Sequence, residues 1–442
     1  MIWLWVSIAW SNPHPTLTEI LQHLPQHPEW KLTHTANQQA KSERLMATAP
    51  FTPTLEGKSS QYGGYYPRDN HQHQIHLNTP LGISVGGGWQ QGLGDFPDYD
   101  GSYTTDRGEF RLETTIPLLD GLWINQARTD LWLADLNVDL VALEQQSTQI
   151  KLILQTELAF WNWQQYWALE QVAKQNLALA NQRQTVFEKK YAVGSTSRLS
   201  VIDNDRERQQ REQLWLQSQQ QTIAGQNKLL YFWRTEDGQM QASPTVPTLD
   251  IQNISIPQPP PSQWDISNRP DIALYGLITE QIRLQLQLVQ AKKLPKVNLI
   301  ASYDHAIEST KQSESYVGLK YEHAPLLRAE KSKQSALEAK NEAIQLYQRK
   351  TMDKANQDLR TLHNRWVQLV NQIETQQEVV KLAQEAVELE QIRFDNGGSD
   401  LLDLIKRENN WLKAQSTLIK LIIEVYVVEA MWRATLGISS IP

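Results

Sequence analysis

Three histidines lie close together in this sequence, at His71, His73 and His76. Imidazole nitrogens are frequent metal ligands, so the cluster is a candidate metal site. Without a carboxylate or sulfur side chain in a recognised ligand spacing, a solvated polar loop is the preferred interpretation. The chain contains no cysteine, which excludes disulfides, thiolate chemistry and a lipidated N-terminal cysteine. We identify no paired nucleophile and base and no phosphate-binding loop, so the sequence predicts neither an enzyme nor a bound cofactor.

Charge and hydropathy argue against two further classes of protein. The net charge is −7 at pH 7 and no basic patch stands out, which argues against nucleic acid as a partner. Hydrophobic residues make up 40% of the chain, the mean hydropathy is −0.52, and no apolar run is long enough for a membrane helix. The sequence therefore predicts neither a nucleic-acid-binding protein nor a helical membrane protein.

Two short segments interrupt long helical patterns with glycine. One is Phe394–Asp400, which contains Gly397 and Gly398, and the other is Tyr191–Ser197, which contains Gly194. Glycine readily adopts the positive φ angles of a sharp reversal, so each segment is predicted to be the tip of a helical hairpin. The two tips align at a constant spacing of 203 residues, which indicates a duplicated unit.

The duplication extends over most of the chain. Pro28 matches Pro270 at a spacing of 242, whereas Pro117 matches Pro325 at 208, so 34 extra residues lie between the two strands of the first half. Each half is predicted to contain a helix, a strand, a loop, a strand, a long helix, a tip and a helix. We divide the chain into a first repeat at 12–241, a stiff, surface-running proline-rich connector at 242–263, and a second repeat at 264–442.

The first eleven residues form a short apolar segment. Its length suits the core of a signal peptide, and Ser7-Ile8-Ala9 is a passable cleavage site. No Lys or Arg precedes the apolar residues, which departs from the usual signal. We expect residues 1–11 to be a signal peptide.

Three segments alternate apolar and polar side chains with a period of two, at 110–116, 297–304 and 317–322. Such strands suit a membrane barrel with apolar groups toward lipid, and each alone fits a half-buried strand of a soluble sheet equally well. The extra residues, at about 63–107, are expected to form an additional hairpin that projects from the loop, because extra strands between helices on one side of a membrane must come in pairs. Its aromatic residues could line a membrane interface or pack a core of their own, namely Trp89, Phe96, Tyr99 and Tyr103.

Two segments of about 70 residues lack internal glycine and proline, at 121–190 and 326–393. A helix of that length spans roughly 105 Å, which indicates a coiled coil or tube. Trp163 and Trp366 match at the 203 spacing and are predicted to pack in a shared aromatic belt. A seven-residue repeat is interrupted in the first half and continuous in the second. In the first half its members are Leu158, Val172, Leu179 and Val186. In the second half they are Met352, Leu359, Trp366, Ile373, Val380, Val387 and Phe394 before the tip, and Leu404, Trp411, Leu418, Val425 and Trp432 after it.

These features together resemble the TolC family of outer-membrane efflux channels. The resemblance covers about residues 16 to 437 in order. It includes the duplication, the tips in which an aromatic residue precedes a glycine by three, and three short motifs: Arg269-Pro270-Asp271, Leu294-Pro295 and Pro117-Leu118-Leu119-Asp120-Gly121.

The resemblance implies a mainly helical chain with a membrane β-barrel, located in the bacterial outer membrane and spanning into the periplasm. Each chain of a homotrimer would give four strands to a 12-stranded barrel in outer-membrane lipid, and its long helical hairpins to a periplasmic α-barrel tunnel. The tips would contact a periplasmic adaptor protein that belongs to an inner-membrane pump, through Tyr191, Gly194, Ser195, Phe394, Gly397 and Gly398.

The resemblance also implies a gate close to the tips. Asp403 stands where the family's second tip carries its aspartate, Lys406 stands where some members place another acid, and Ser200 replaces the aspartate of the first tip. Three like charges on a threefold axis would bind cations and repel anions. The alternative for Asp403 is an acid that stabilises a helix N-terminus, and Asp400 is expected to be an N-cap.

Several functions remain open on the sequence. Export of small molecules or metal ions leads over protein export by type I secretion. A soluble periplasmic coiled-coil scaffold or adaptor would explain the helices and tips but not the alternating strands, and an envelope enzyme would need a convergent polar site that we do not find.

Overall fold

A computed structural model describes residues 15–95, 97–99, 102–241, 255–260, 262–307, 312–323 and 326–438. The expected signal peptide at 1–11, Phe96 and most of the connector lie outside these residues. The structure divides into two compact units, each of which is described by itself. The helical unit comprises Met1–His34, Gln145–Ile272 and Thr351–Pro442, and the sheet unit comprises Thr35–Glu144 and Ala273–Lys350.

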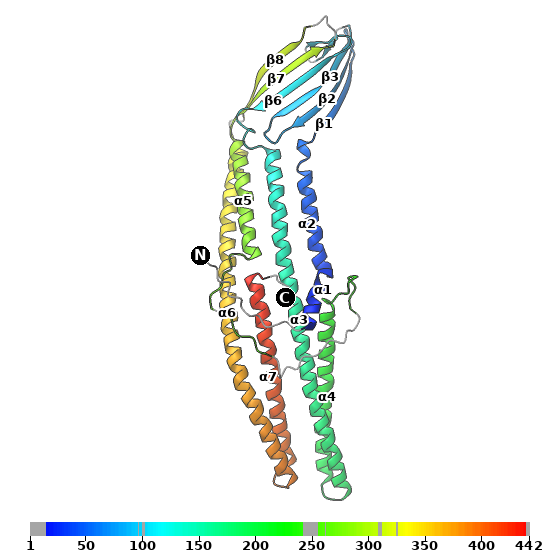
Figure 1. Cartoon of the computed structure of the whole chain (residues 1–442), viewed down its shortest axis with the longest axis vertical. Helices are drawn as coiled ribbons and strands as arrows, with labels where there is room; N and C mark the ends of the chain where they lie inside the picture. The colour runs from blue at the N-terminus through cyan, green and yellow to red at the C-terminus, as the bar shows by residue number, and fades with distance from the viewer. Residues whose placement is uncertain are drawn as a thin grey trace. The chain divides into compact units, whose positions relative to one another are not determined.

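Helices form most of the described chain (Figure 1). Pro28 and Pro270 each begin a helix, at the first position where a missing N–H costs nothing, as their pairing in the duplication predicts. Within the described residues, no helix has the length and apolarity needed to cross a membrane. The helices are α1 (Pro15–His23), η1 (Leu24–Gln26), α2 (Pro28–Met46), η2 (Ala49–Phe51), α3 (Gln126–Ala192), α4 (Arg198–Leu230), α5 (Pro270–Ala291), α6 (Arg328–Asp395) and α7 (Leu401–Leu436).

The sheet unit contains a six-stranded antiparallel sheet in the order β1-β2-β3-β6-β7-β8. The prediction of four strands is therefore wrong. The extra pair predicted for the first half does exist, but β2 and β3 lie within the sheet between β1 and β6 rather than projecting from it. The strands are β1 (Thr54–Tyr62), β2 (Arg68–Asn78), β3 (Ser84–Gly94), β6 (Glu109–Pro117), β7 (Lys296–Ala306) and β8 (Glu314–Glu322), with a separate small pair, β4 (Asp98–Tyr99) and β5 (Ser102–Tyr103).

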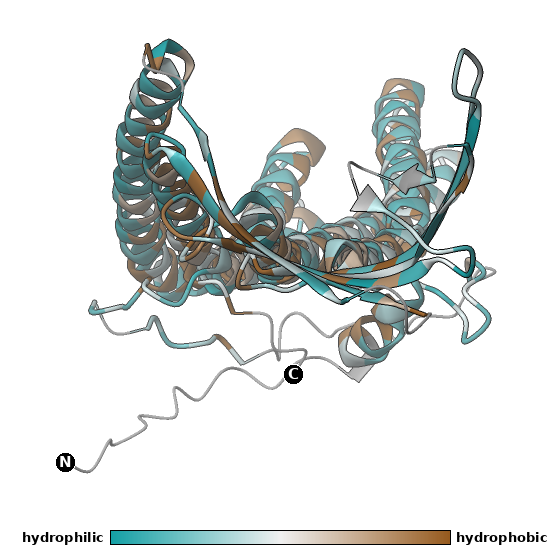
Figure 2. Ribbon diagram, turned by 90° about the horizontal axis from the view of Figure 1, so that it is seen from above, coloured by the Kyte–Doolittle hydropathy of each residue, from teal (hydrophilic) through white to brown (hydrophobic). Residues whose placement is uncertain are grey.

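Strand pairing separates an apolar from a polar face over β6, β7 and β8 and the adjoining ends of β1 and β2, whereas Ser59, His71 and Gln91 place polar groups on the apolar side further along. Leu55 pairs with Ile75, and Leu299 pairs with both Ile116 and Leu319, so these apolar side chains share one face. Their polar neighbours along each strand share the other face. The predicted alternation is thus confirmed, and Figure 2 shows the hydropathy along the curved sheet.

The three histidines belong to β2 rather than to a loop, so the loop interpretation is wrong. His71 and His73 lie on the apolar face, where His71 contacts Ser59 and His73 stacks on Trp89. His76 lies on the polar face, 3.9 Å from Glu56. Alternation along the strand therefore separates the cluster that the sequence placed together.

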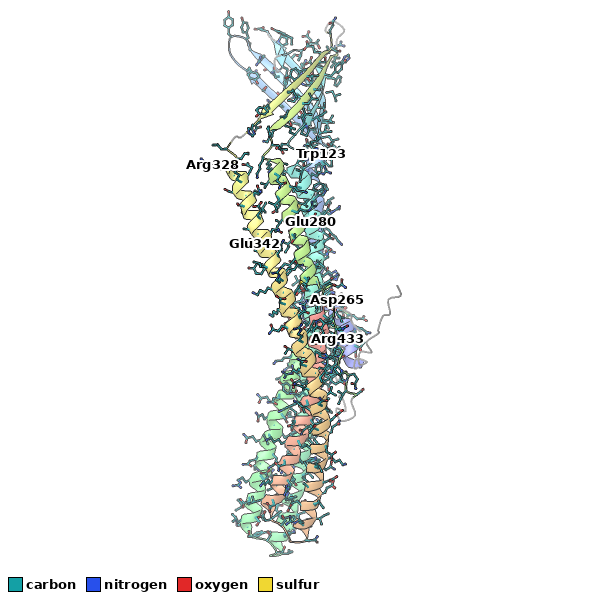
Figure 3. All side chains as sticks on the ribbon, turned by 90° about the vertical axis from the view of Figure 1, so that its left-hand side faces the viewer. Trp123, Asp265, Glu280, Arg328, Glu342 and Arg433 are labelled. Atoms are coloured by element: carbon teal, nitrogen blue, oxygen red, sulfur yellow. The ribbon has the colours of Figure 1, made fainter. Side chains whose placement is uncertain are left out.

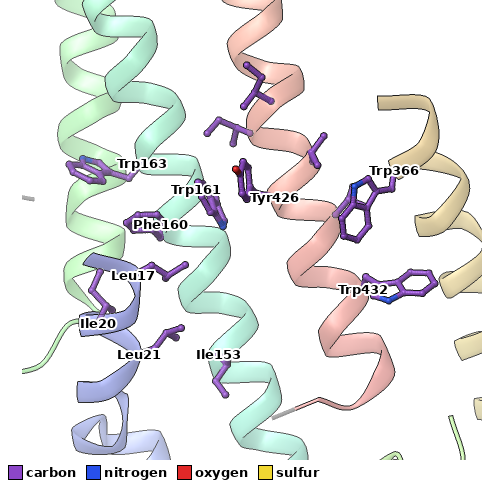
Figure 4. Packing of buried hydrophobic residues seen from close by; sticks show 14 of the residues in the cluster. Leu17, Ile20, Leu21, Ile153, Phe160, Trp161, Trp163, Trp366, Tyr426 and Trp432 are labelled. Atoms are coloured by element: carbon purple, nitrogen blue, oxygen red, sulfur yellow. The ribbon is translucent and has the colours of Figure 1, made fainter. Parts of the chain in front are cut away.

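Aromatic and aliphatic side chains fill the centre of the helical unit (Figure 4). Leu17, Ile20 and Leu21 of α1 belong to the same buried cluster as Phe160 of α3. The ring of Trp161 stacks on Tyr426 at 4.1 Å between centroids. This contact joins α3 to α7, which belong to different hairpins.

The predicted packing role of Trp163 and Trp366 is confirmed, since both are buried in this cluster. The indole N–H of Trp366 donates to the carbonyl oxygen of Pro257 at 3.2 Å, and Pro257 and Pro260 are buried. The described end of the connector therefore packs on the core instead of running along the surface.

The heptad prediction is confirmed for most of the second half, although Met352 is 37% exposed, and it is wrong toward the end of α3 in the first. Leu359, Trp366 and Ile373 of α6 are buried. On α3, Leu179 and Val186 are 37% and 47% exposed. The residues buried toward the end of α3 lie one position after the predicted ones or three before them, and they are partly polar: Asn176, Ala180, Arg183 and Phe187.

Two helical glycines give a matched test of the packing. A Cβ at Gly225 of α4 would lie 2.8 Å from the Tyr166 ring and 3.3 Å from Cα of Trp163, whereas a Cβ at Gly276 of α5 would meet nothing within 4 Å. We expect Gly225→Ala to destabilise the fold by about 1–3 kcal/mol through overpacking. Gly276→Ala should stabilise it by about 0.5–1 kcal/mol through helix propensity. Thermal unfolding followed by circular dichroism in detergent measures both; equal effects would contradict the close approach of α4 to α3.

Candidate functional site

The two predicted tips have the same backbone geometry. Gly194 and Gly397 both have φ of 74°. In the first tip the N–H of Gly194 donates to Tyr191 O and that of Ser195 to Lys190 O, at 2.9 and 2.8 Å. The second tip repeats both bonds 203 residues later, from Gly397 to Phe394 O and from Gly398 to Arg393 O, at 3.0 and 2.8 Å. This pair of bonds is the Schellman motif that ends helices.

The helices that leave the tips are also capped alike. The Ser197 hydroxyl accepts a hydrogen bond from the N–H of Ser200 at 3.1 Å, and the Asp400 carboxylate accepts one from the N–H of Asp403 at 2.9 Å. The expected N-cap role of Asp400 is confirmed. Ser200 and Asp403 are therefore equivalent residues in the first turns of α4 and α7.

Side chains at the two tips differ where the backbones agree. Asp403 and Lys406 are exposed, and Ser200 is half-buried. At the 203 spacing, Lys406 is the equivalent of Asp203, which pairs with Arg206 at 3.6 Å. The acid of the first tip, Asp203, thus lies one turn later in its helix than the acid of the second tip, Asp403. At the position of Asp203 the second tip has the basic residue Lys406 instead.

Aromatic packing connects the two hairpins close to their tips. The ring of Phe394 stacks on Phe187 of α3 at 6.1 Å, and the Lys190 ammonium lies 5.6 Å from the Phe394 centroid. Tyr191, the equivalent of Phe394, is exposed instead. Of the predicted tip residues, the structure therefore ties Phe394 into an interhairpin contact, while Tyr191 faces outward.

A buried carboxylate holds the second tip together. Glu390 of α6 accepts a hydrogen bond from the hydroxyl of Ser399, and its carboxylate lies 3.4 Å from Arg393 and 3.9 Å from Arg407. Its side chain is 6% exposed. Two cations and a hydroxyl compensate its burial, which fixes the tip loop against the start of α7.

A larger buried charge cluster links the hairpins, and the sequence did not reveal it. Glu408 of α7 accepts hydrogen bonds from Arg183 of α3 and from Arg211 of α4, the latter at 2.7 Å. Arg211 also binds Glu207 at 2.9 Å. All three side chains of the central triad are less than 10% exposed. Arg183 and Glu408 are 225 residues apart, so no local pattern could pair them.

A cavity of about 500 Å³ adjoins this cluster. Residues of α3, α4 and α7 line it, among them Leu169, Arg211, Leu214 and Leu412. In the part of the chain that the structure describes, no group of three or more His, Cys, Asp or Glu residues is arranged to hold a metal ion. The site therefore consists of two capped helix reversals and an interhairpin charge cluster.

Comparison with known proteins agrees with this geometry. Residues 265–426 match the family named Outer membrane efflux protein. No curated protein sequence matches the chain. The likeness to solved structures extends much further along the chain than the family match.

Three of these structures illustrate the likeness. CusC is 14% identical over 97% of this chain and 95% of its own, with a TM-score of 0.72. VceC from Vibrio cholerae is 15% identical over 95% and 96%, with a TM-score of 0.70. The MtrE outer membrane channel from Neisseria gonorrhoeae, solved in an open state, is 12% identical over 96% and 89%, with a TM-score of 0.71. At these identities the likeness establishes the fold.

The buried cluster predicts a large cost for removing one arginine. Arg211→Met should destabilise the fold by about 3–5 kcal/mol, because Glu408 stays buried with half of its compensation lost. Arg206→Met on the same helix breaks only an exposed pair and should cost less than about 1 kcal/mol. Chemical unfolding of the two variants measures the difference. Similar costs would show that Glu408 is not held by buried charge.

Proposed function

We propose that this chain, which belongs to the outer membrane efflux protein family, assembles as a homotrimer that forms a continuous export channel. Membership makes it an outer-membrane transport protein and not an enzyme. The observation that carries the proposal is the sheet, which is largely apolar on one face and polar on the other, and whose outer strands pair on one side only within the described residues. Lipid accepts the apolar face, and three copies closed edge to edge leave the polar faces around a wet pore.

The helical hairpins form the periplasmic part of this channel. The 67 residues of α3 and the 68 of α6 each span about 100 Å as helix, far more than one compact domain needs. Leu179 and Val186, exposed in a single chain, become contacts between neighbouring copies.

The tips dock a periplasmic adaptor, which connects the channel to an inner-membrane pump. A Cβ at Gly194 or Gly397 would meet nothing within 4 Å, so both reversals are open to a partner. The contacts are Tyr191, Gly194 and Ser195 at the first tip and Phe394, Gly397 and Gly398 at the second. The pump supplies the energy, and its cargo is a small molecule or a metal ion; the efflux character of the family favours this over protein secretion.

Asp403, Lys406 and Ser200 form the gate close to the tips. Asp403 and Lys406 are exposed on successive turns of α7, and the N–H of Asp403, not its carboxylate, is used in the helix cap. Three copies bring three such carboxylates to the pore axis. The acids then favour cations, with Lys406 one turn further along moderating that preference.

The trimer is tested on protein extracted from the outer-membrane fraction with detergent. Light scattering should give the mass of three chains of 50.9 kDa each, after subtraction of the detergent. Negative-stain images should show particles with threefold symmetry. A monomer recovered from the soluble periplasmic fraction would overturn the proposal and leave a coiled-coil scaffold in its place.

The gate is tested by single-channel recording in a lipid bilayer. Asp403→Ala should raise the conductance and weaken the preference for cations, because the acid ring both narrows the pore and attracts cations. Asp395→Ala is the matched control, since Asp395 lies on the α6 side of the same tip and bonds to Gln391 at 3.0 Å. Equal recordings from the parent and Asp403→Ala would remove Asp403 from the gate.

A further inference from the structure

We propose that the trimer forms an eighteen-stranded barrel and that the segment between β3 and β6 lies inside it as a constriction loop. This loop limits the size of the molecules that pass the outer end of the barrel. The described residues of this constriction loop are 97–99 and 102–107. The inference rests on the proposed function, because only the trimer turns the polar face of the sheet into the wall of a pore.

The number of strands follows from the sheet order. Within the described chain β1 and β8 are the two edges, and every pairing between them is antiparallel. Six strands is an even number, so β8 of one copy runs antiparallel to β1 of the next and the edges can pair. Three copies then close eighteen strands. Barrels of 16–18 strands leave an aqueous channel wide enough for large solutes.

The constriction loop lies over the polar face of this sheet. β4 contacts both β2 and β3, and those two strands pair with each other along their whole length. β3 pairs with β6 only as far as Gln90, so it is the side chain of Tyr99 that shows β4 to lie over a face. The phenol of Tyr99 donates to Gln72 at 2.7 Å, and Gln72 belongs to the polar face. Figure 2 shows the short strands on the inside of the curved sheet.

A second contact fixes the other end of the constriction loop. The Thr104 hydroxyl accepts a hydrogen bond from the N–H of Gly92 at 2.8 Å and lies 3.2 Å from its carbonyl oxygen. Tyr99 and Thr104 thus both attach the described residues of the constriction loop to the sheet.

The loop excludes water from the part of the polar face that it covers. Asn70 of β2 is 6% exposed, and Gln90 of β3 is fully buried in a hydrogen bond of 2.7 Å to Glu109. Tyr99 and Thr104 are buried with them. Glu113, on the same face and closer to the end of β6 that leads into α3, has a side chain that is 43% exposed. Water therefore reaches the polar face around Glu113 but not beneath the constriction loop.

The inserted strands and the loop therefore have opposite effects on the pore. The strands β2 and β3 enlarge the barrel, and the segment that follows them fills part of the enlarged lumen. The expected outcome is a filter that admits small hydrophilic solutes from outside and excludes bulky polymers.

The chain has no native cysteine, which permits a labelling test from outside the cell. The probe residue is Glu113→Cys, on the polar face beyond the loop. A small charged methanethiosulfonate and a bulky poly(ethylene glycol) maleimide are applied to whole cells, and the same protein is then extracted for mass determination. With the constriction loop intact, the small reagent should label Glu113→Cys and the bulky one should not.

The loop is loosened by adding Tyr99→Phe and Thr104→Val, which remove these two side-chain contacts while preserving side-chain size; the bonds from Trp89 and Gln91 to the carbonyl oxygens of Arg107 and Asp106 remain. The bulky reagent should then react about tenfold faster, the factor that corresponds to the loss of one to two neutral hydrogen bonds. The control is Tyr65→Phe in the loop between β1 and β2, which should change nothing. If the double variant fails to assemble, replacement of residues 97–104 by two glycines tests the same point.

The outcomes separate the two proposals. A trimer whose Glu113→Cys reacts with the bulky reagent at one rate in all variants overturns the constriction loop alone. A trimer that excludes the bulky reagent even after the loop is shortened also overturns it, because another feature then limits the pore. A monomer overturns the trimeric channel itself, whatever the labelling rates.

Discussion

Backbone hydrogen bonding at the edges of the sheet constrains everything else in this structure. A strand in lipid cannot leave its N–H and C=O groups unpaired, since no water is present to satisfy them. Within the described residues, β1 and β8 each pair on one side only, and the proposed trimer is what would cover both edges. An even number of antiparallel strands allows identical copies to do this for one another. Apolar groups on one face and polar groups on the other then follow from having lipid outside and water inside.

The helical unit combines an apolar core with a few buried ionic contacts. Burial raises the pKa of the Glu157 carboxyl, and its partner Arg433, at 2.8 Å, acts in the opposite direction. Figure 3 labels Arg433 on α7. Glu408 with its two arginines provides a second contact of this kind. The aromatic and aliphatic cluster supplies most of the burial, while these ion pairs penalise any displacement of one hairpin along the other.

The duplication preserved backbone geometry and let the side chains diverge. Both tips close with the same two hydrogen bonds and the same type of cap, because glycine at positive φ and a short polar N-cap solve a purely local problem. Ser200 and Asp403 occupy equivalent positions and yet offer different charge. In the proposed trimer there are six similar reversals but only three acids equivalent to Asp403.

The sequence by itself determined the elements and their order. Glycine spacing, proline positions and the periods of two and seven are local properties, and they located the tips, the helices, the alternating strands and the second buried seam. Tertiary structure decided which residues meet across long separations. The buried stripe of α3 became polar because Arg183 reaches Glu408, and the histidines separated because β2 joined the sheet. The strand count and the inward fold of the segment after β3 depend on pairing partners that no local period encodes.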